Sequence, residues 1–230
     1  PYDPSIEALR SLRTSLRFLM SDIKSNLIMI SSANPGEGKS FVTVNLAAVI
    51  AQSGKRVIVV DADMRKSYLH RMFGVSSKNG LSDILSGTLD IKNSVLETSI
   101  KNLYFMPRGE NAINPSELLM DPNFEILTKN LSNTFDLVIF DTPPILAVTD
   151  ASIIGSYCSQ NMMVSRFGLS SSKEVLAAKN RFNLNGIDIS NVIFNAIQKK
   201  ASSYYYDDIF AYSSAVEGYY KTPIESQSIK

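Results

Sequence analysis

The sequence between residues 27 and 40 is Leu27-Ile28-Met29-Ile30-Ser31-Ser32-Ala33-Asn34-Pro35-Gly36-Glu37-Gly38-Lys39-Ser40. An apolar run leads into a turn of small residues, and a helical pattern over residues 39–53 follows. A strand, a glycine-rich turn and a helix in this order are typical of a P-loop, here with Ala33 in place of the first glycine. The stretch therefore predicts a strand that delivers a phosphate-binding loop to the start of a helix.

Each residue type of this loop suits a bound nucleotide. Small residues let backbone N–H groups wrap a phosphate, Lys39 neutralises the β and γ oxygens, and Ser40 ligates Mg²⁺. An ordinary glycine-rich turn is the alternative, which the position between a strand and a helix disfavours. By analogy with related P-loop folds, we expect Asn195 to touch the adenine. The expected nucleotide-binding residues are Ala33, Asn34, Pro35, Gly36, Glu37, Gly38, Lys39, Ser40, Phe41 and Asn195.

Two further apolar runs end in carboxylates. Asp61 and Asp63 follow the run Val57 to Val60, and Asp141 follows the run Leu137 to Phe140, resembling a Walker B motif. A single aspartate at a strand end is usually a helix cap or a turn residue. Three beside a P-loop are better explained by Mg-nucleotide, because magnesium takes oxygen ligands and parallel sheets bind ligands at the carboxyl ends of their strands. The expected metal shell is Ser40, Asp61, Asp63 and Asp141.

Apolar runs alternate with helical patterns along the chain. Strands that are continuously apolar are buried on both faces, as in a parallel sheet covered by helices. We expect helices over 39–53, 116–132 and 172–184, and an α/β fold: a three-layer sandwich with a mainly parallel sheet. The runs expected as strands are Leu27 to Ile30, Val57 to Val60, Leu103 to Met106, Leu137 to Phe140, Met162 to Val164 and Val192 to Phe194.

The composition excludes several classes of function. The chain has 230 residues with 23 basic and 22 acidic side chains, a formal net charge of +1, so we expect no nucleic-acid partner. One histidine and one cysteine are too few for the usual zinc site, and we expect Cys158 to be a buried core residue. The longest apolar run, Leu46 to Ala51, is far below the ~20 residues that span a bilayer.

Three segments are expected. Residues 1–25 contain an amphipathic helix over 3–20, residues 26–200 form the nucleotide-binding domain, and residues 201–230 form a flexible tail with too few aliphatic residues for a core. The apolar face of the helix carries Ile6, Leu9, Leu12, Leu16 and Leu19, and its other face carries Glu7, Arg10, Arg13 and Arg17. The tail holds six of the ten tyrosines, namely Tyr204, Tyr205, Tyr206, Tyr212, Tyr219 and Tyr220.

Together these motifs resemble those of the bacterial tyrosine kinases (BY-kinases). The shared features are the P-loop, the run ending Asp61-x-Asp63-x-Arg65, the run ending at Asp141, and the tyrosine-rich tail. Such kinases are the cytoplasmic domains of polysaccharide co-polymerases for capsule and exopolysaccharide export. The resemblance covers essentially the whole chain, and it implies a P-loop NTPase fold like that of MinD and ParA.

The resemblance also implies an activity and partners. It implies an ATP- and Mg²⁺-dependent protein-tyrosine autokinase that phosphorylates the tail tyrosines between subunits of a ring. Lys39, Asp61, Asp63, Arg65 and Asp141 are then the catalytic residues, and Glu7-x-x-Arg10-x-x-Arg13 is the subunit contact. A periplasmic domain flanked by two transmembrane helices is expected upstream, which places this domain on the cytoplasmic side of the inner membrane. A cognate tyrosine phosphatase and the polysaccharide export machinery are the implied partners.

Several points stay open at the level of sequence. Ile84 stands where some relatives carry a further regulatory tyrosine, and either Asp61 or Asp63 suits the role of base. Arg65 suits either the transferring oxygens or a structural ion pair, and Asp150 is expected to cap a helix. Two other functions share this site: a MinD- or ParA-type ATPase, whose additional P-loop lysine is Asn34 here, and a nucleotide-dependent assembly scaffold that transfers no phosphate.

Overall fold

A seven-stranded sheet forms the centre of the protein. The computed structural model describes residues 4–20 and 25–198, and its strands lie in the order β3-β4-β2-β5-β1-β6-β7. All neighbouring strands run parallel except β3, which pairs antiparallel with β4 at one edge. The strands are β1 (Leu27–Ser32), β2 (Val57–Asp61), β3 (Leu96–Glu97), β4 (Leu103–Met106), β5 (Leu137–Asp141), β6 (Gln160–Arg166) and β7 (Asn191–Asn195).

The apolar runs are continuous because both faces of the sheet are covered. Along β1, the side chains of Leu27 and Met29 join the core on one face, whereas Ile28 and Ile30 join the core on the other. Alternate residues of a strand point to opposite faces, so a strand covered on both sides has no solvent-facing side. Every residue of β1, β2 and β5 is buried.

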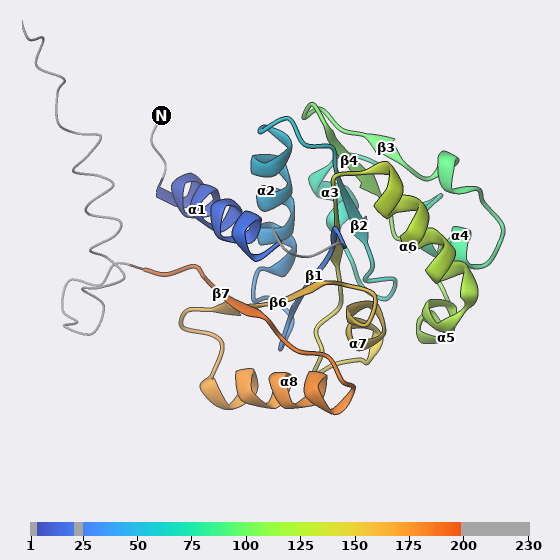
Figure 1. Ribbon diagram of the computed structural model, residues 1–230. Coiled ribbons are helices and arrows are strands. Elements are labelled where there is room, and N and C mark those ends of the chain that lie inside the picture. Colours follow the sequence, from blue (N-terminus) through green and yellow to red (C-terminus); the bar gives the residue numbers. More distant parts are fainter. Residues whose placement is uncertain (1–3, 21–24, 199–230) are drawn as a thin grey trace, which may run out of the picture.

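Helices form the two outer layers (Figure 1). Helices α1 (Pro4–Leu19), α2 (Lys39–Ala51) and α3 (Leu69–Met72) cover one face, and α4 to α8 cover the other. The second group is α4 (Leu81–Leu85), α5 (Pro115–Met120), α6 (Pro122–Thr134), α7 (Asp150–Gly155) and α8 (Ser172–Leu184), with the 3₁₀ turn η1 (Ile91–Asn93) between α4 and β3. The fold is the predicted three-layer α/β sandwich with a mainly parallel sheet.

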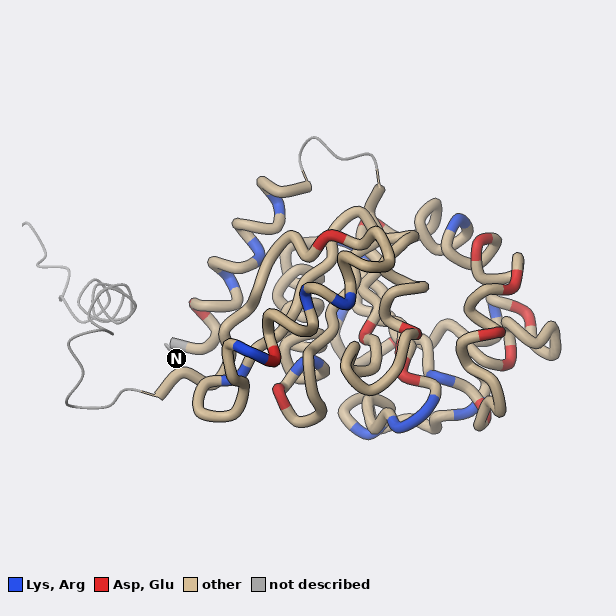
Figure 2. Tube along the Cα trace, turned by 90° about the horizontal axis from the view of Figure 1, so that it is seen from below, with Lys and Arg blue, Asp and Glu red and all other residues tan. Residues whose placement is uncertain are grey.

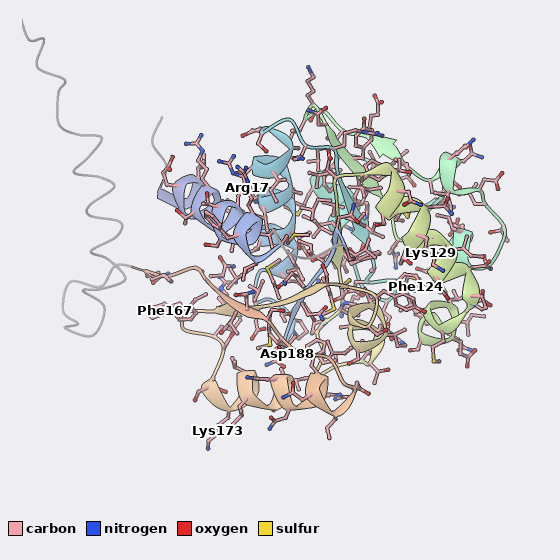
Figure 3. The ribbon with its side chains drawn as sticks, viewed as in Figure 1. Arg17, Phe124, Lys129, Phe167, Lys173 and Asp188 are labelled. Atoms are coloured by element: carbon pink, nitrogen blue, oxygen red, sulfur yellow. The ribbon has the colours of Figure 1, made fainter. Side chains whose placement is uncertain are left out.

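Aromatic packing fixes α6 on the sheet. The ring of Phe124 in α6 lies 5.9 Å from that of Phe140 in β5 and 5.0 Å from that of Tyr157, both edge to face. Figure 3 shows Phe124 on the side of α6 that faces the sheet. Such pairs each add about 1 kcal/mol beyond the burial of their area. This packing holds β5, and therefore Asp141 at its end, in place.

Several predictions about elements need correction. The helix expected over 116–132 is two helices, because Asp121 precedes Pro122, adopts an extended conformation and caps α6 by accepting the N–H of Asn123. Ile6 and Leu19, predicted on the apolar face of α1, are exposed, since α1 packs mainly on α2 with a narrower stripe that includes Leu16. The short elements α3, α4, η1 and β3 were not predicted.

Two residues that the sequence analysis singled out, Cys158 and Ile84, lie in or beside the core under α4 to α8. Cys158 is only partly buried, packed beside the core under α4 to α8, and not enclosed as expected. Ile84 of α4 is buried in that core.

The tyrosine-rich tail lies outside the described residues. Among those residues, no helix combines the length and the apolar composition that crossing a membrane requires.

Candidate nucleotide-binding and phosphoryl-transfer site

The parallel sheet brings the predicted site residues to one edge. Asp61 at the end of β2 is in register with Asp141 at the end of β5, and Asp141 is in register with Ile30 of β1. Because β1, β2 and β5 run in the same direction, the P-loop that follows β1 begins beside both aspartates. The structure thus gathers three segments, 33–41, 61–65 and 141, that are far apart in the sequence.

Asp141 is the centre of the hydrogen-bond network. Its Oδ2 accepts the Ser40 hydroxyl at 2.6 Å and lies 3.4 Å from the Lys39 ammonium, while its Oδ1 accepts the Thr43 hydroxyl at 2.9 Å. The Asp141 side chain is buried, and these donors offset its desolvation. The P-loop lysine and serine are therefore both bound to the carboxylate of the Walker B-like strand.

Lys39 lies among three carboxylates. Its ammonium is 3.9 Å from Asp63 Oδ2 and 3.4 Å from Asp141 Oδ2. Burial lowers the pKa of Lys39, but the negative charges of Asp141, Asp63 and Asp61 together raise it above its ordinary value. Lys39 is therefore charged at neutral pH, as an ammonium that binds phosphate oxygens must be.

Asp61 has little compensation for its burial. The residue is fully buried, and neither carboxylate oxygen has a hydrogen-bond partner of good geometry among the described residues. Burial raises the pKa of Asp61 to about 8, and the charges of Asp141 and Asp63 add to the rise, whereas the Ser67 hydroxyl and Lys39 oppose it. A buried carboxylate without hydrogen-bond donors is costly in free energy. A bound cation or a proton would therefore stabilise Asp61.

Asp63 is oriented by the backbone. Its Oδ1 accepts the N–H of Lys66 at 2.9 Å and that of Arg65 at 3.3 Å, which fixes the turn after β2. Its other oxygen, Oδ2, is the one that faces Lys39. One oxygen of Asp63 is thus structural, and the second is directed at the site.

Arg65 forms the structural ion pair that the sequence left open. Its Nε and Nη2 donate to the two oxygens of Asp150 at 2.8 and 3.0 Å, and Ser116 donates to Asp150 Oδ1 at 2.7 Å. The predicted capping role of Asp150 is wrong, because Thr149 holds the cap position of α7 and Asp150 is the first helical residue. Hydrogen bonding to Asp150 raises the pKa of Arg65 further. This pair joins the turn after β2 to α5 and α7.

The P-loop backbone requires glycine at two positions. Gly36 and Gly38 have φ angles of 82° and 94°, in the left-handed region that other residues avoid. A Cβ at Gly38 would lie 2.1 Å from the amide nitrogen of Asn195. That amide donates to the Glu37 carbonyl at 3.1 Å, so the structure places Asn195 against the P-loop. Phe41 exposes about half of its side chain at the start of α2.

The predicted subunit-contact residues lie along α1, where Figure 2 shows basic positions. Arg10 pairs with Glu7 within the helix, and Arg13 donates to the carbonyl of Val49 in α2 at 3.3 Å. These contacts are made inside one chain. Binding of this motif to another subunit stays a prediction.

Several residues that contact the site were not predicted from the sequence. Thr43 is one helical turn after Lys39, a spacing that puts both on one side of α2 and is the signal that was available. Ser170, Arg166 and Glu174 contact the P-loop from the segment after β6, across more than 120 positions. No local pattern in the sequence predicts such contacts.

The donor set fits magnesium bound with a nucleotide. Ser40, Asp61, Asp63 and Asp141 supply only oxygens, and the unpartnered Asp61 carboxylate is a position that a cation would stabilise. Among the described residues, no three histidine, cysteine or acidic side chains form a metal cage. Magnesium carried by nucleotide phosphates needs only one or two protein ligands, so such a cage is not required.

The fold and site define a P-loop nucleotide-binding domain. The family model described as AAA domain matches residues 25–165. The same architecture appears in the septum site-determining protein MinD of Pyrococcus horikoshii, solved with Mg-ADP (TM-score 0.65, 23% identity, covering 80% of this chain and 76% of that one). At this identity, the likeness concerns the fold alone.

Within that class, the chain belongs to the bacterial tyrosine kinase family. The kinase domain of the Escherichia coli tyrosine kinase ETK superposes with a TM-score of 0.83 and 41% identity, covering 86% of this chain and 78% of that domain. The tyrosine-protein kinase wzc of Salmonella typhimurium is 47% identical over 89% of this chain. The chain spans 28% of the length of that relative.

Proposed function

We propose that this domain is an ATP-dependent protein-tyrosine autokinase. The observation that carries the proposal is the convergence of Lys39, Ser40, Asp61, Asp63 and Asp141 at one sheet edge in a chain that shares 41% identity with a solved tyrosine kinase domain. We further propose that the acceptors are the tail tyrosines of another copy, because a tethered tail has a roughly millimolar effective concentration at a neighbouring site.

The charges of the site suit phosphoryl transfer. Such transfer passes through a loose transition state that needs positioning and charge neutralisation more than covalent chemistry. Backbone N–H groups of the P-loop and the Lys39 ammonium would bind the phosphates, and Ser40 and Asp141 would hold the metal. When bound, Mg²⁺ neutralises charge that develops between the β and γ phosphates. Lys39 would exchange its contact with Asp141 for the phosphates, and Ser40 would exchange its contact with Asp141 for the metal.

Asp63 is the proposed acceptor of the phenol proton. A candidate base is chosen first by geometry and then by pKa. The Oδ1 of Asp63 is fixed by two backbone N–H groups, which aims Oδ2 into the site, whereas Asp61 lies deeper, beside Asp141. We assign Asp61 to the metal shell, where a cation supplies the partner that this carboxylate lacks. Arg65 supports the turn through Asp150 and reaches transferring oxygens only if that pair opens.

The wider setting follows the relatives. We propose that the domain acts in a ring assembled through Glu7, Arg10 and Arg13, at the cytoplasmic face of the inner membrane. Its phosphorylation state would regulate capsule or exopolysaccharide synthesis and export, and a cognate tyrosine phosphatase would reset it. The 47% identity with the tyrosine-protein kinase wzc of Salmonella typhimurium supports this setting.

Transfer between molecules is tested with a mixture of two variants. Lys39→Met chains are incubated with wild-type chains and Mg-ATP, and phosphotyrosine is located by mass spectrometry. We expect phosphotyrosine on the tails of the Lys39→Met chains in the mixture and none on these chains alone. Lys173→Met is the matched control, because Lys173 lies at the exposed start of α8 (Figure 3). Inorganic phosphate release without any phosphotyrosine would instead support the ATPase or the scaffold.

A further inference from the structure

Side chains at the end of β6, in the segment between β6 and α8, and at the end of β7 form hydrogen bonds with the P-loop. In a phosphate-binding loop the N–H groups converge on the anion, so its carbonyls point outward. Two of these carbonyls have side-chain donors here. Arg166 Nη1 donates to the Gly36 carbonyl at 2.9 Å, and Asn195 Nδ2 donates to the Glu37 carbonyl at 3.1 Å.

Glu37 is the buried element of this support. Its side chain is almost completely enclosed, and both carboxylate oxygens are used. Oε2 accepts the backbone N–H of Asn34 at 3.1 Å, which closes the loop on itself, and Oε1 accepts the Ser170 hydroxyl at 2.5 Å. In this structure the Asn34 N–H is therefore bound to Glu37, although the sequence led us to expect it at the phosphates.

Ser170 connects the loop to the sheet. Its hydroxyl also accepts the backbone N–H of Arg166 at the end of β6, at 2.8 Å. Ser170 lies in the turn between Phe167 and Lys173, both labelled in Figure 3. One further contact joins the same elements, from the Asn34 amide to Glu174 of α8 at 2.8 Å. The strand β6 and the helix α8 thus determine where the P-loop stands.

We infer that Glu37 and Ser170 are positioning residues that hold the P-loop in its phosphate-binding conformation. A loop with two left-handed glycines has many accessible conformations when it is unsupported. Binding would then have to order the loop, and this cost lowers affinity. The Glu37 to Ser170 contact orders the loop before the nucleotide arrives. This inference rests on the proposed nucleotide site.

A purely structural role of Glu37 and Ser170 would give a different experimental result. The Ser170 contact lies on a turn and not in either apolar core. Its removal is therefore expected to change nucleotide affinity much more than global stability. Nucleotide affinity and the melting temperature without nucleotide, measured on the same variants, separate the two roles.

Ser170→Ala is the first test, with Mg-ADP binding measured by isothermal titration calorimetry. Hydrogen bonds to charged groups are strong enough for us to expect an approximately ten-fold rise in Kd, with a fall of only a few degrees in the melting temperature from the Glu37 oxygen left without its donor. Ser170→Thr keeps the hydroxyl and should restore the affinity. Ser172→Ala is the matched control, because Ser172 is exposed two residues away and has no described contact with the P-loop. An unchanged Kd for Ser170→Ala would overturn the inference.

Glu37→Gln tests the other partner and the coupling between the two. We expect the double variant to bind Mg-ADP about as weakly as Glu37→Gln alone, because both changes break the same contact. Fully additive effects would contradict the inference. Failure of the wild-type chain to bind Mg-ADP would instead overturn the nucleotide site, and the positioning role with it. In kinase assays the variants should raise KM for ATP more than they lower kcat.

Discussion

Two buried aspartates near the carboxyl edge of the sheet have opposite surroundings. Asp150 is fully buried and accepts three hydrogen bonds, two from Arg65 and one from Ser116. Asp61 is equally buried and accepts none of good geometry from described residues. A satisfied buried carboxylate maintains the fold, whereas an unsatisfied one costs stability and persists where function requires it. The difference separates a structural acid from a functional one.

The largest effect is expected from Asp61→Asn on activity. The amide keeps the size of the side chain but removes the negative charge assigned to the metal shell. We expect the rate of tail phosphorylation to fall by about a hundred-fold or more. Quantitative mass spectrometry of phosphotyrosine over time measures it. A rate within a few-fold of wild type would remove Asp61 from the catalytic machinery.

Asp150→Asn tests the other side of the comparison. The change leaves the Arg65 guanidinium without its carboxylate partner. Because the Arg65 side chain is about one-third exposed, water compensates part of this loss. We expect the free energy of unfolding to fall by about 2 kcal/mol. Urea denaturation measures this loss. Ser116→Ala removes only one of the three hydrogen bonds and should cost about 1 kcal/mol. If Asp150→Asn is as stable as wild type, then the pair is not structural.

The pH dependence of stability should distinguish Asp61 from ordinary carboxylates. A pKa raised from 3.8 to about 8 on folding means that protonated Asp61 is favoured in the folded state. Its contribution is fully present below pH 4 and is lost as the pH rises through about 8. Asp61→Asn should therefore gain stability relative to wild type as the pH rises over this range, and the gain should level off above pH 8. Urea titrations at several pH values, without nucleotide, would contradict this if the difference were constant.

The smallest effect on the free energy of unfolding is expected from an exposed ion pair. Lys129 and Glu125 lie one turn apart on the outer side of α6, with their charged atoms 2.5 Å apart. Solvent weakens such pairs, so we expect Lys129→Ala to cost at most about 0.5 kcal/mol. Thermal unfolding at low and high salt measures it. A cost near that of Asp150→Asn would mean that burial does not explain the contrast between the aspartates.

Sequence patterns predicted the local parts of this site and missed the distant ones. The P-loop and the strand ends at Asp61 and Asp141 were predicted, because each is a short pattern attached to a buried strand. The partners of Arg65 and Glu37 were not, because Asp150 and Ser170 lie 85 and 133 positions away in sequence. Such partners depend on how strands are ordered in the sheet. The break at Asp121 was available from the proline that follows it.

The proposed role of Asp61 in the metal shell depends on its lack of a good hydrogen-bond partner among the described residues. Carboxyl-carbon NMR of labelled aspartate, assigned with Asp61→Asn, measures the pKa of this group directly. We expect a pKa of about 8 in the free protein and a marked fall with Mg-ADP, because a nearby cation favours the carboxylate. An ordinary pKa near 4 without nucleotide, or a raised pKa that Mg-ADP leaves unchanged, would contradict it.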